Sequence, residues 1–273
     1  MKVISMSKEC YATLTMNDDK LEYAQHLVNS IRYFDKERPI FALTEDDLEL
    51  EGATTYKYDM LRKPPRKYLY VTRSKPYGIY KLLKEGYKIF YLDSDCLVLD
   101  DITEIFNNKE DITACVDEGW PNQTPPSFHY KSVEVKGGTY INSGVMFIND
   151  TKAWQLASDI CMSEKEYKQV WDIRNPNVKY ESVKDSNLVV HNLMEQDIIN
   201  YSIYKTQSSL NILDNKIFNY HGHLGDYESL KPQDLRVLHW SGGPNAPSIR
   251  KRIEFIKEWN PEYYKYLHEV AQV

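Results

Sequence analysis

The sequence predicts an α/β protein in which one sheet lies between two layers of helices. Strand-like apolar runs alternate along the chain with segments whose apolar residues recur at helical spacing, a pattern typical of a three-layer α/β architecture. The chain has 273 residues, of which 42% are hydrophobic and 27% charged, so it can bury a proper core. In such sheets, ligands bind at the carboxyl ends of the strands.

The first elements have clear boundaries in the sequence. An apolar strand is expected at residues 11–16, and Asn17 can cap the helix that follows. The apolar residues of this helix recur at helical spacing: Leu21, Ala24, Leu27, Val28 and Ile31. A second strand is expected at residues 39–44 and a second helix at 75–85, with Gly86 just past its end.

The run from Ile89 to Leu99 is the most informative part of the chain. It has strand composition and is interrupted only around Asp93 and Asp95, so one buried strand is expected with both carboxylates on one face. Two such carboxylates repel each other and lose hydration, and a divalent cation would keep both ionised. The alternative is that Asp93 ends the strand and Asp95 starts a turn, where aspartate is common. The apolar residues on both sides favour the functional interpretation.

The second half of the chain continues the alternation. A short helix is expected to open at Asp100 or Asp101, and Pro121 to Gly138 reads as a long binding loop. The other expected elements are strands at 111–116, 140–149 and 236–239, and helices at 152–169, 195–204 and from 248 on.

Composition narrows the function classes. A net charge of −6 gives no sign of a nucleic-acid-binding surface. The four cysteines form no CxxC pair, which favours buried free thiols over disulfides or a zinc site. The N-terminus lacks a signal-peptide pattern, and no apolar window is long enough to span a bilayer. A cytoplasmic protein without a membrane span is therefore expected.

Six short motifs follow one another in order. They are Thr13 to Asp18, Tyr91 to Val98, Asp117 to Pro121, Tyr140 to Phe147, Glu195 to Asn200 and Val237 to Gly242. Together they resemble the motifs of glycosyltransferase family 8, including its metal-binding Asp-x-Asp, its Asn-Ser-Gly strand and its late metal histidine. The third motif resembles the glycogenin-like members. The resemblance spans roughly Tyr11 to Pro247, and its strength lies in the order of the motifs.

The resemblance implies a GT-A fold with a mixed central sheet, in a single domain over residues 1–273 with a helical C-terminal segment at 248–273. It implies retaining transfer of a hexose, expected to be glucose from UDP-glucose, to an unknown carbohydrate or protein acceptor. Asp93, Asp95 and His239 would bind Mn²⁺, with Mg²⁺ as the alternative. Such a cation would stabilise the UDP anion as a Lewis acid. A homodimer is implied by resemblance alone.

Further site residues also come from the resemblance. Gln196 is expected beside the anomeric carbon as a catalytic residue, and Glu195 is assigned with it as a group suited to sugar hydroxyls. The residues expected to bind the donor are Leu14, Thr15, Asn17, Lys75, Ser94, Asp117, Asn142, Ser143, Gly144 and Gly242. Retention by double displacement needs a nucleophile, for which Gln196 is poor. Front-side attack is the alternative, and the sequence leaves both open.

Several of these residues also have a purely structural interpretation. His239 could be a core histidine, Asn17 a helix cap, and Glu195 with Gln196 the first turn of a helix that favours acidic residues. The Asn142 to Gly144 segment could be a β-bulge.

Three positions depart from the family pattern. Asn245 to Pro247 lacks the usual lysine, Glu195 replaces an aspartate, and Lys75 lies at slightly longer spacing than usual. A binding module of the same fold, without catalysis, is therefore one alternative. Another is a haloacid-dehalogenase-like phosphatase, although the stretch from Gly225 to Leu230 lacks the later aspartate of that class.

Overall fold

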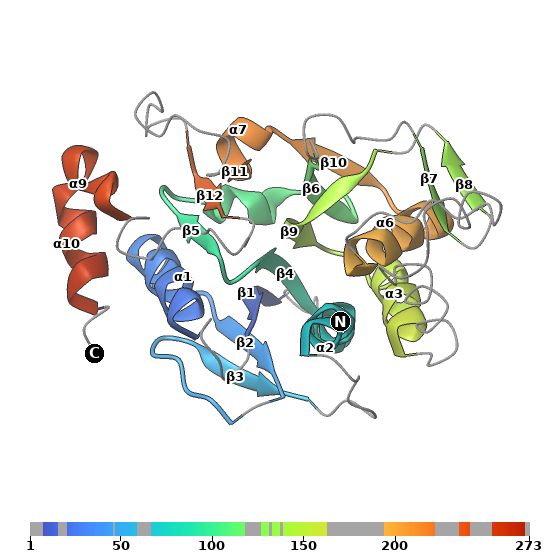
Figure 1. Ribbon diagram of the computed structural model, residues 1–273, viewed down its shortest axis with the longest axis horizontal. Coiled ribbons are helices and arrows are strands. Elements are labelled where there is room, and N and C mark those ends of the chain that lie inside the picture. Colours follow the sequence, from blue (N-terminus) through green and yellow to red (C-terminus); the bar gives the residue numbers. More distant parts are fainter. Residues whose placement is uncertain are drawn as a thin grey trace, which may run out of the picture.

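A computed structural model confirms the α/β architecture, with a central sheet between helices on its two sides (Figure 1). The structure describes residues 8–15, 21–45, 47–58, 67–117, 127–130, 133–136, 139–162, 194–221, 235–240 and 253–270. Among the described helices, none is both long and apolar enough to cross a membrane.

The central sheet has seven strands in the order β10-β6-β9-β4-β1-β2-β3. Only β9 runs antiparallel to its neighbours β4 and β6, so the sheet is mixed, as expected. The strands are β1 (Lys8–Leu14), β2 (Ile40–Thr44), β3 (Thr54–Lys57), β4 (Tyr87–Leu92), β6 (Ile112–Val116), β9 (Ile141–Ile148) and β10 (Leu210–Leu213).

Two smaller sheets accompany it. One has the order β11-β12-β5 and consists of β11 (Tyr220–His221), β12 (Val237–His239) and β5 (Cys96–Val98). The other is the hairpin of β7 (Ser127–Tyr130) and β8 (Val133–Lys136). This hairpin lies within the segment expected to be one long loop, so that expectation is wrong for these strands.

Helices cover both faces of the central sheet. The described helices of the chain are α1 (Leu21–Phe34), α2 (Lys67–Lys84), the 3₁₀ helix η1 (Thr103–Asn107), α3 (Lys152–Met162), α6 (Met194–Thr206), α7 (Asn215–Phe218), α9 (Ile256–Trp259) and α10 (Pro261–Val270). Apolar residues of α2, α3 and α6 pack on one face, and those of α1 and η1 pack on the other. The C-terminal helices α9 and α10 pack with β5 and β12 (Figure 1).

The alternation of side chains in β1 shows why the sheet is buried on both faces. Ala12 and Leu14 contribute to the core under α2, whereas Tyr11 contributes to the core under α1. Because successive side chains of a strand point to opposite faces, a strand buried on both sides reads as a continuous apolar run. The four cysteines are buried free thiols, in agreement with the sequence-based expectation.

The apolar run from Ile89 to Leu99 is not one strand, which corrects the sequence-based expectation. It forms β4 in the central sheet and β5 in the small sheet, and residues 93–95 lie between them. Cys96 N–H donates a hydrogen bond of 2.9 Å to the carbonyl of Asp93, which closes a turn. The turn interpretation of this segment is therefore the structurally correct one.

The boundary of α2 was also misplaced. The sequence predicts a helix at residues 75–85, but α2 begins at Lys67 and continues through Pro76. Gly86 takes the expected position after this helix, with φ of +86°. Three strands, β3, β10 and β11, were missed altogether.

Candidate functional site

The candidate site lies at one edge of the central sheet. Strands β1 and β4 are parallel neighbours, so the residues that follow them, Thr15 and Asp93, lie at the same edge. Strand β9 is antiparallel to β4, so Asn142, Ser143 and Gly144 near its start lie at this edge. The sheet topology therefore brings three separate segments of the sequence together.

The Asp93–Asp95 turn is fixed by backbone hydrogen bonds on both sides. Asp93 N–H donates to the carbonyl of Gly144 at 2.8 Å, which extends the pairing of β4 with β9. Trp240 N–H donates to the carbonyl of Asp95 at 3.2 Å. The two carboxylates are thus brought together by a turn that joins two sheets, and not by the alternation of a single strand.

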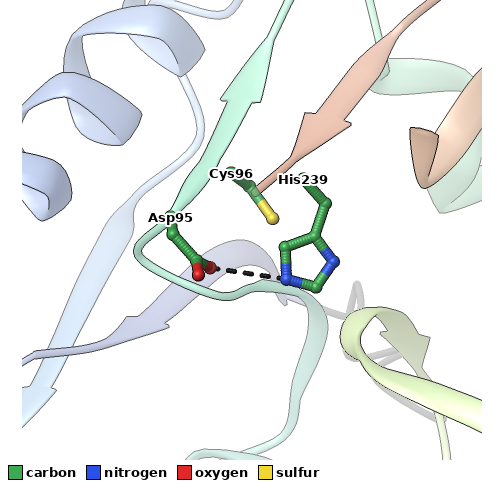
Figure 2. Close-up of side chains that lie close together, drawn as sticks. All are labelled: Asp95, Cys96 and His239. Carbon is green, nitrogen blue, oxygen red and sulfur yellow. Dashed lines mark ion pairs between the residues drawn. The ribbon is translucent and has the colours of Figure 1, made fainter. Parts of the chain in front are cut away.

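His239 completes this arrangement from β12. In the antiparallel pairing of β12 with β5, His239 lies directly opposite Cys96, so both side chains lie on one face of the small sheet. The Nε2 atom of His239 is 3.4 Å from Asp95 Oδ1 and 4.0 Å from Asp93 Oδ2. Figure 2 shows the imidazole beside the Asp95 carboxylate and the Cys96 sulfur.

The second ring nitrogen of His239 determines what the first can do. Nδ1 lies 2.8 Å from Oδ1 of Asn219, and an amide oxygen only accepts hydrogen bonds, so Nδ1 carries a proton. In the neutral ring, the lone pair therefore lies on Nε2, which faces the carboxylates. Burial alone would lower the pKa of His239, but the hydrogen bond and charge of Asp95 and the charge of Asp93 outweigh it and raise the pKa.

These residues fit a divalent cation. Ligand atoms of Asp95, Cys96 and His239 lie within 4.8 Å of one another. A metal-binding imidazole typically donates its other N–H to an oxygen acceptor, which is the arrangement of His239 and Asn219. Carboxylate oxygens and a neutral imidazole are donors that Mn²⁺ accepts. The chemistry of the donor set therefore supports a cation site without specifying the ion.

Gly144 leaves the space that this cluster needs. A Cβ atom at this position would lie 2.3 Å from Cε1 of His239 and 2.9 Å from both Nε2 of His239 and Oδ2 of Asp93. Such distances are far below van der Waals contact, so no larger residue fits without displacing the site. The Asn-Ser-Gly sequence thus requires its glycine for close approach and not for an unusual backbone angle.

Lys75 reaches the first aspartate from α2. Its Nζ is 3.0 Å from Asp93 Oδ1 and 3.5 Å from Glu195 Oε1, and it donates to the carbonyl and hydroxyl oxygens of Ser143 at 3.2 and 3.3 Å. Burial would lower the pKa of Lys75, but Asp93 and Glu195 more than compensate and raise it. Lys75 is therefore a buried ammonium group that bridges the turn and α6.

Both the oxygen and the nitrogen of the Gln196 side-chain amide make hydrogen bonds. Its Oε1 accepts a hydrogen bond of 2.8 Å from the backbone N–H of Ser143, and its Nε2 donates to Oδ2 of Asp117. A backbone N–H can only donate and a carboxylate can only accept, so the two partners fix the orientation of the amide. Gln196 is 3% exposed. It therefore ties α6 to β9 and to the end of β6.

The charges of the site are unbalanced. Among the described residues, four carboxylates surround this edge, those of Asp93, Asp95, Asp117 and Glu195. The ammonium group of Lys75 offsets part of this charge. Carboxylates that lose hydration repel one another strongly unless positive charge compensates them. A bound divalent cation would supply that compensation.

The remaining predicted residues vary in their relation to this cluster. Asn142 is buried, and its Oδ1 accepts a 2.9 Å bond from Gly144 N–H, which holds the strand backbone. Leu14 and Thr15 are buried at the end of β1. Asn17 and Gly242 lie outside the described residues, as do the Asn245 to Pro247 segment and the stretch 163–193.

A small hollow lies beside the turn. Its lining residues come from α1, the turn, β5 and the segments around β12 and α9: Tyr23, His26, Ser94, Cys96, Leu97, Trp240 and Ile253. The hydroxyl oxygens of Thr13 and Thr15 are buried and have no hydrogen-bond partner within the part of the chain that the structure describes. The hollow is lined in part by α1, and Thr13 and Thr15 alternate with Leu14, which packs in the core under α2.

Sequence reasoning missed three residues of the cluster. Asn219 orients His239 from twenty positions earlier in the chain, and no local pattern marks it. Tyr91 donates a hydrogen bond of 2.7 Å to Asp93 Oδ1, and its position two residues before Asp93 was the available signal. Cys96 was interpreted only as a buried thiol, although it directly follows Asp95.

Residues 48–243 match the model of a family described as nucleotide-diphospho-sugar transferase. A search of curated proteins finds no match.

Solved structures cover almost the whole chain. The galactosyltransferase LgtC, in complex with donor and acceptor sugar analogues, is 16% identical with a TM-score of 0.53 over 96% of this chain and 95% of its own. The glycosyltransferase GlyE of Streptococcus pneumoniae is 16% identical, with a TM-score of 0.52 over 96% of this chain and 63% of its own. The bifunctional glycosyltransferase WbbM is 15% identical, with a TM-score of 0.55 over 96% of this chain and 52% of its own.

Proposed function

The chain belongs to the nucleotide-diphospho-sugar transferase family and has a GT-A fold, and we propose that it is a metal-dependent retaining hexosyltransferase that uses a UDP-sugar. The observation that carries this proposal is the convergence of Asp93, Asp95 and His239 over Gly144. The Asn219-oriented ring and the missing Cβ support a cation at this point. Mn²⁺ is the proposed ion, with Mg²⁺ as the alternative.

The cation, when bound, would stabilise the negative charge that develops on the UDP phosphates as the sugar leaves. Residues of the chain prepare for this step. Asp93 and Asp95 hold the site on a turn fixed by β9 and Trp240. Lys75 places a buried positive charge beside the same turn, where it can face the donor. Together these groups would bind the diphosphate and exclude water from it.

The nucleoside and sugar parts of the donor would lie on opposite sides of the turn. The buried hydroxyls of Thr13 and Thr15, which have no partner among the described residues, and the hollow beside Ser94 support uridine binding on one side, together with Leu14 and Asn17. On the other side, polar groups suited to sugar hydroxyls are proposed to be Asp117, Asn142 and Glu195. Gly242 is proposed to contact the donor phosphates.

The hydrogen bonds of the Gln196 side-chain amide support front-side attack over double displacement. Both ends of its amide already make hydrogen bonds, and an amide is a poor nucleophile in any case. In front-side attack, the acceptor oxygen forms the new bond on the face from which UDP departs. The departing phosphate oxygen then takes the acceptor's proton, so no protein nucleophile is needed. Gln196 and Glu195 would position and stabilise the sugar.

Glucose is the proposed sugar, because the Asp117 to Pro121 segment resembles glycogenin-like proteins. The acceptor is a carbohydrate or a protein. We further propose that residues 1–273 act as a single catalytic domain, with a homodimer and a cytoplasmic location as the working hypotheses.

The test is release of UDP from a panel of UDP-sugars with Mn²⁺. Released UDP with one sugar supports the transferase and names the donor. The matched variant is Asp95→Asn, which keeps the size of the side chain and removes its charge. Compared with the wild type, it should lose both Mn²⁺-dependent UDP binding and turnover. If UDP binds with Mn²⁺ but no sugar is turned over with any acceptor offered, a binding module of this fold is favoured. If UDP does not bind, the proposal is wrong.

A further inference from the structure

We propose that Cys96 gives this cation site a thiol donor, so that the site binds borderline-soft divalent cations such as Co²⁺ and Zn²⁺ through Asp95, Cys96 and His239. This inference rests on the proposed function in one respect, that a divalent cation enters the site. It adds a second class of cation and a different set of ligands. It therefore predicts how the protein responds to cations other than Mn²⁺.

The register of the small sheet places the thiol beside the imidazole. Cys96 and His239 are directly opposite residues of an antiparallel pair, so their side chains share one face. Figure 2 shows the sulfur directed toward the space beside the ring, on the side where the Asp95 carboxylate also lies. The three ligand atoms lie within 4.8 Å of one another. Cys96 also lines the hollow beside the turn.

The distances favour a small tetrahedral site. With metal–ligand bonds of about 2.0 to 2.3 Å, two ligand atoms of a tetrahedral zinc site lie roughly 3.3 to 3.6 Å apart. The separation between Asp95 Oδ1 and His239 Nε2 is already 3.4 Å. The sulfur, within 4.8 Å, needs only a modest side-chain movement to join them. A water or a donor oxygen would complete the fourth position.

The ion pair and hydrogen bond of Asp93 distinguish the binding of a hard cation from the binding of a softer one. Its Oδ1 is engaged by Lys75 at 3.0 Å and by the hydroxyl of Tyr91 at 2.7 Å. A hard cation that prefers oxygen would draw on both aspartates and on donor phosphates. A softer cation gains more from a sulfur ligand, and it can use Asp95, Cys96 and His239 while Asp93 keeps its ion pair with Lys75.

The charges of this second mode balance. As the metal–sulfur bond forms, the Cys96 S–H bond breaks and its proton passes to the buffer. One thiolate and one carboxylate then neutralise the divalent cation, and the imidazole binds as a neutral ligand through Nε2. No oxidant or reductant takes part. The expected consequence is tight binding of Zn²⁺ in competition with Mn²⁺.

The first experiment is a titration of the metal-free protein with Co²⁺, followed by absorption spectroscopy. Visible d–d bands report that the cation binds, and a near-ultraviolet charge-transfer band reports a bond between thiolate and Co²⁺. We expect both in the wild type. The Cys96→Ser variant should keep the d–d bands and lose the charge-transfer band. Cys10→Ala, which alters a buried thiol of β1 far from the turn, should keep both.

The second experiment measures Zn²⁺ affinity by competition with a chromogenic chelator. Loss of outer-shell partners of a metal already costs about 10- to 100-fold in affinity, so loss of a ligand in Cys96→Ser should weaken Zn²⁺ binding on the order of a hundredfold. Mn²⁺ affinity should change little. Cys96→Ala, with its smaller apolar side chain, provides a second variant if the serine is poorly tolerated.

The outcomes separate this inference from the proposed function. Co²⁺ d–d bands without a charge-transfer band in the wild type would overturn the role of Cys96 and leave the cation site intact. Equal Zn²⁺ affinity in the wild type and both Cys96 variants would do the same. Absence of any Co²⁺ binding would overturn the inference. Release of UDP with Mn²⁺, measured on the same preparation, then decides the proposed function independently.

Discussion

Replacement of Gly144 by alanine should disable the cation site while leaving the fold intact. The added Cβ would lie 2.3 Å from Cε1 of His239, whereas ordinary contact begins at 3.4 Å, so the two atoms must separate by about 1.1 Å. The Cβ also lies 2.9 Å from Oδ2 of Asp93. Gly144 does not have a positive φ, so the alanine backbone itself is unstrained. The conflict is therefore between the methyl group and the two proposed ligands.

The magnitude follows from that displacement. A misplacement of about 1 Å in a catalytic group can cost on the order of a hundredfold in rate. His239 cannot retreat freely, because it is 4% exposed and its Nδ1 is held by Asn219. We therefore expect Gly144→Ala to lower the rate of UDP release at least about a hundredfold. Mn²⁺ affinity, measured by calorimetric titration, should fall with it.

Gly86→Ala is the matched control. Gly86 has φ of +86° and no atom within 4 Å of a Cβ built on it, so alanine there strains the backbone without touching the site. It should lower the free energy of unfolding by about 1 kcal/mol and leave Mn²⁺ affinity unchanged. If Gly144→Ala bound Mn²⁺ and released UDP like the wild type, the assignment of His239 and Asp93 to one cation site would be refuted.

Three further predictions concern Asn219, Lys75 and Asp35, each of which holds another side chain by a hydrogen bond or an ion pair. Asn219→Ala should weaken Mn²⁺ binding about 10- to 100-fold in a calorimetric titration, because it frees the ring of His239 to rotate; unchanged affinity would show that the ring needs no such support. Lys75→Met should lower the free energy of unfolding of the metal-free protein by about 3 kcal/mol, because the partly buried Asp93 loses its partner. Mn²⁺ should raise the melting temperature of this variant more than that of the wild type, and an equal rise would contradict the prediction. Asp35→Asn should flatten the acid side of the stability profile in urea melts. Burial raises the pKa of Asp35, but its hydrogen bonds lower the net value, so its stabilisation is present above a pH of about 3.9 and is lost as pH falls through the folded pKa; a difference from wild type that stays constant between neutral and acid pH would refute this.

The aspartate pair shows what local sequence can and cannot predict. The sequence identified Asp93 and Asp95, but it placed them on one face of a continuous strand. In the structure, their convergence depends on a turn that joins two sheets and on contacts with Gly144 and Trp240. Those contacts come from residues that lie about fifty and one hundred and forty-five positions later in the sequence. The two aspartates could be picked out from the sequence, whereas their geometry depended on the topology of the whole sheet.

Lys75 is a different case, because its spacing left its position relative to Asp93 open and the structure shows that position. Its spacing to the metal strand is longer than the family pattern, yet its ammonium group lies 3.0 Å from Asp93. Helix α2 extends from Lys67 through Pro76, so Lys75 lies inside the helix and not at its start. A flexible four-carbon side chain then covers the remaining difference. Motif spacing alone therefore does not determine which side chains can reach a site.

The residues that were missed explain why part of such a site escapes sequence reasoning. Asn219 lies just before β11 and His239 ends β12, and these two strands are parallel neighbours in the small sheet. Their pairing brings an amide oxygen to the imidazole, although nothing in the sequence around either residue indicates it. An amide in a loop is ordinary, and its role appears only when its partner is known. If Asn219 sets the tautomer of His239, then Asn219→Asp, which keeps an oxygen acceptor, should preserve Mn²⁺ binding far better than Asn219→Ala. Equal losses in the two variants would mean that the packing of the amide, and not its oxygen, supports the site.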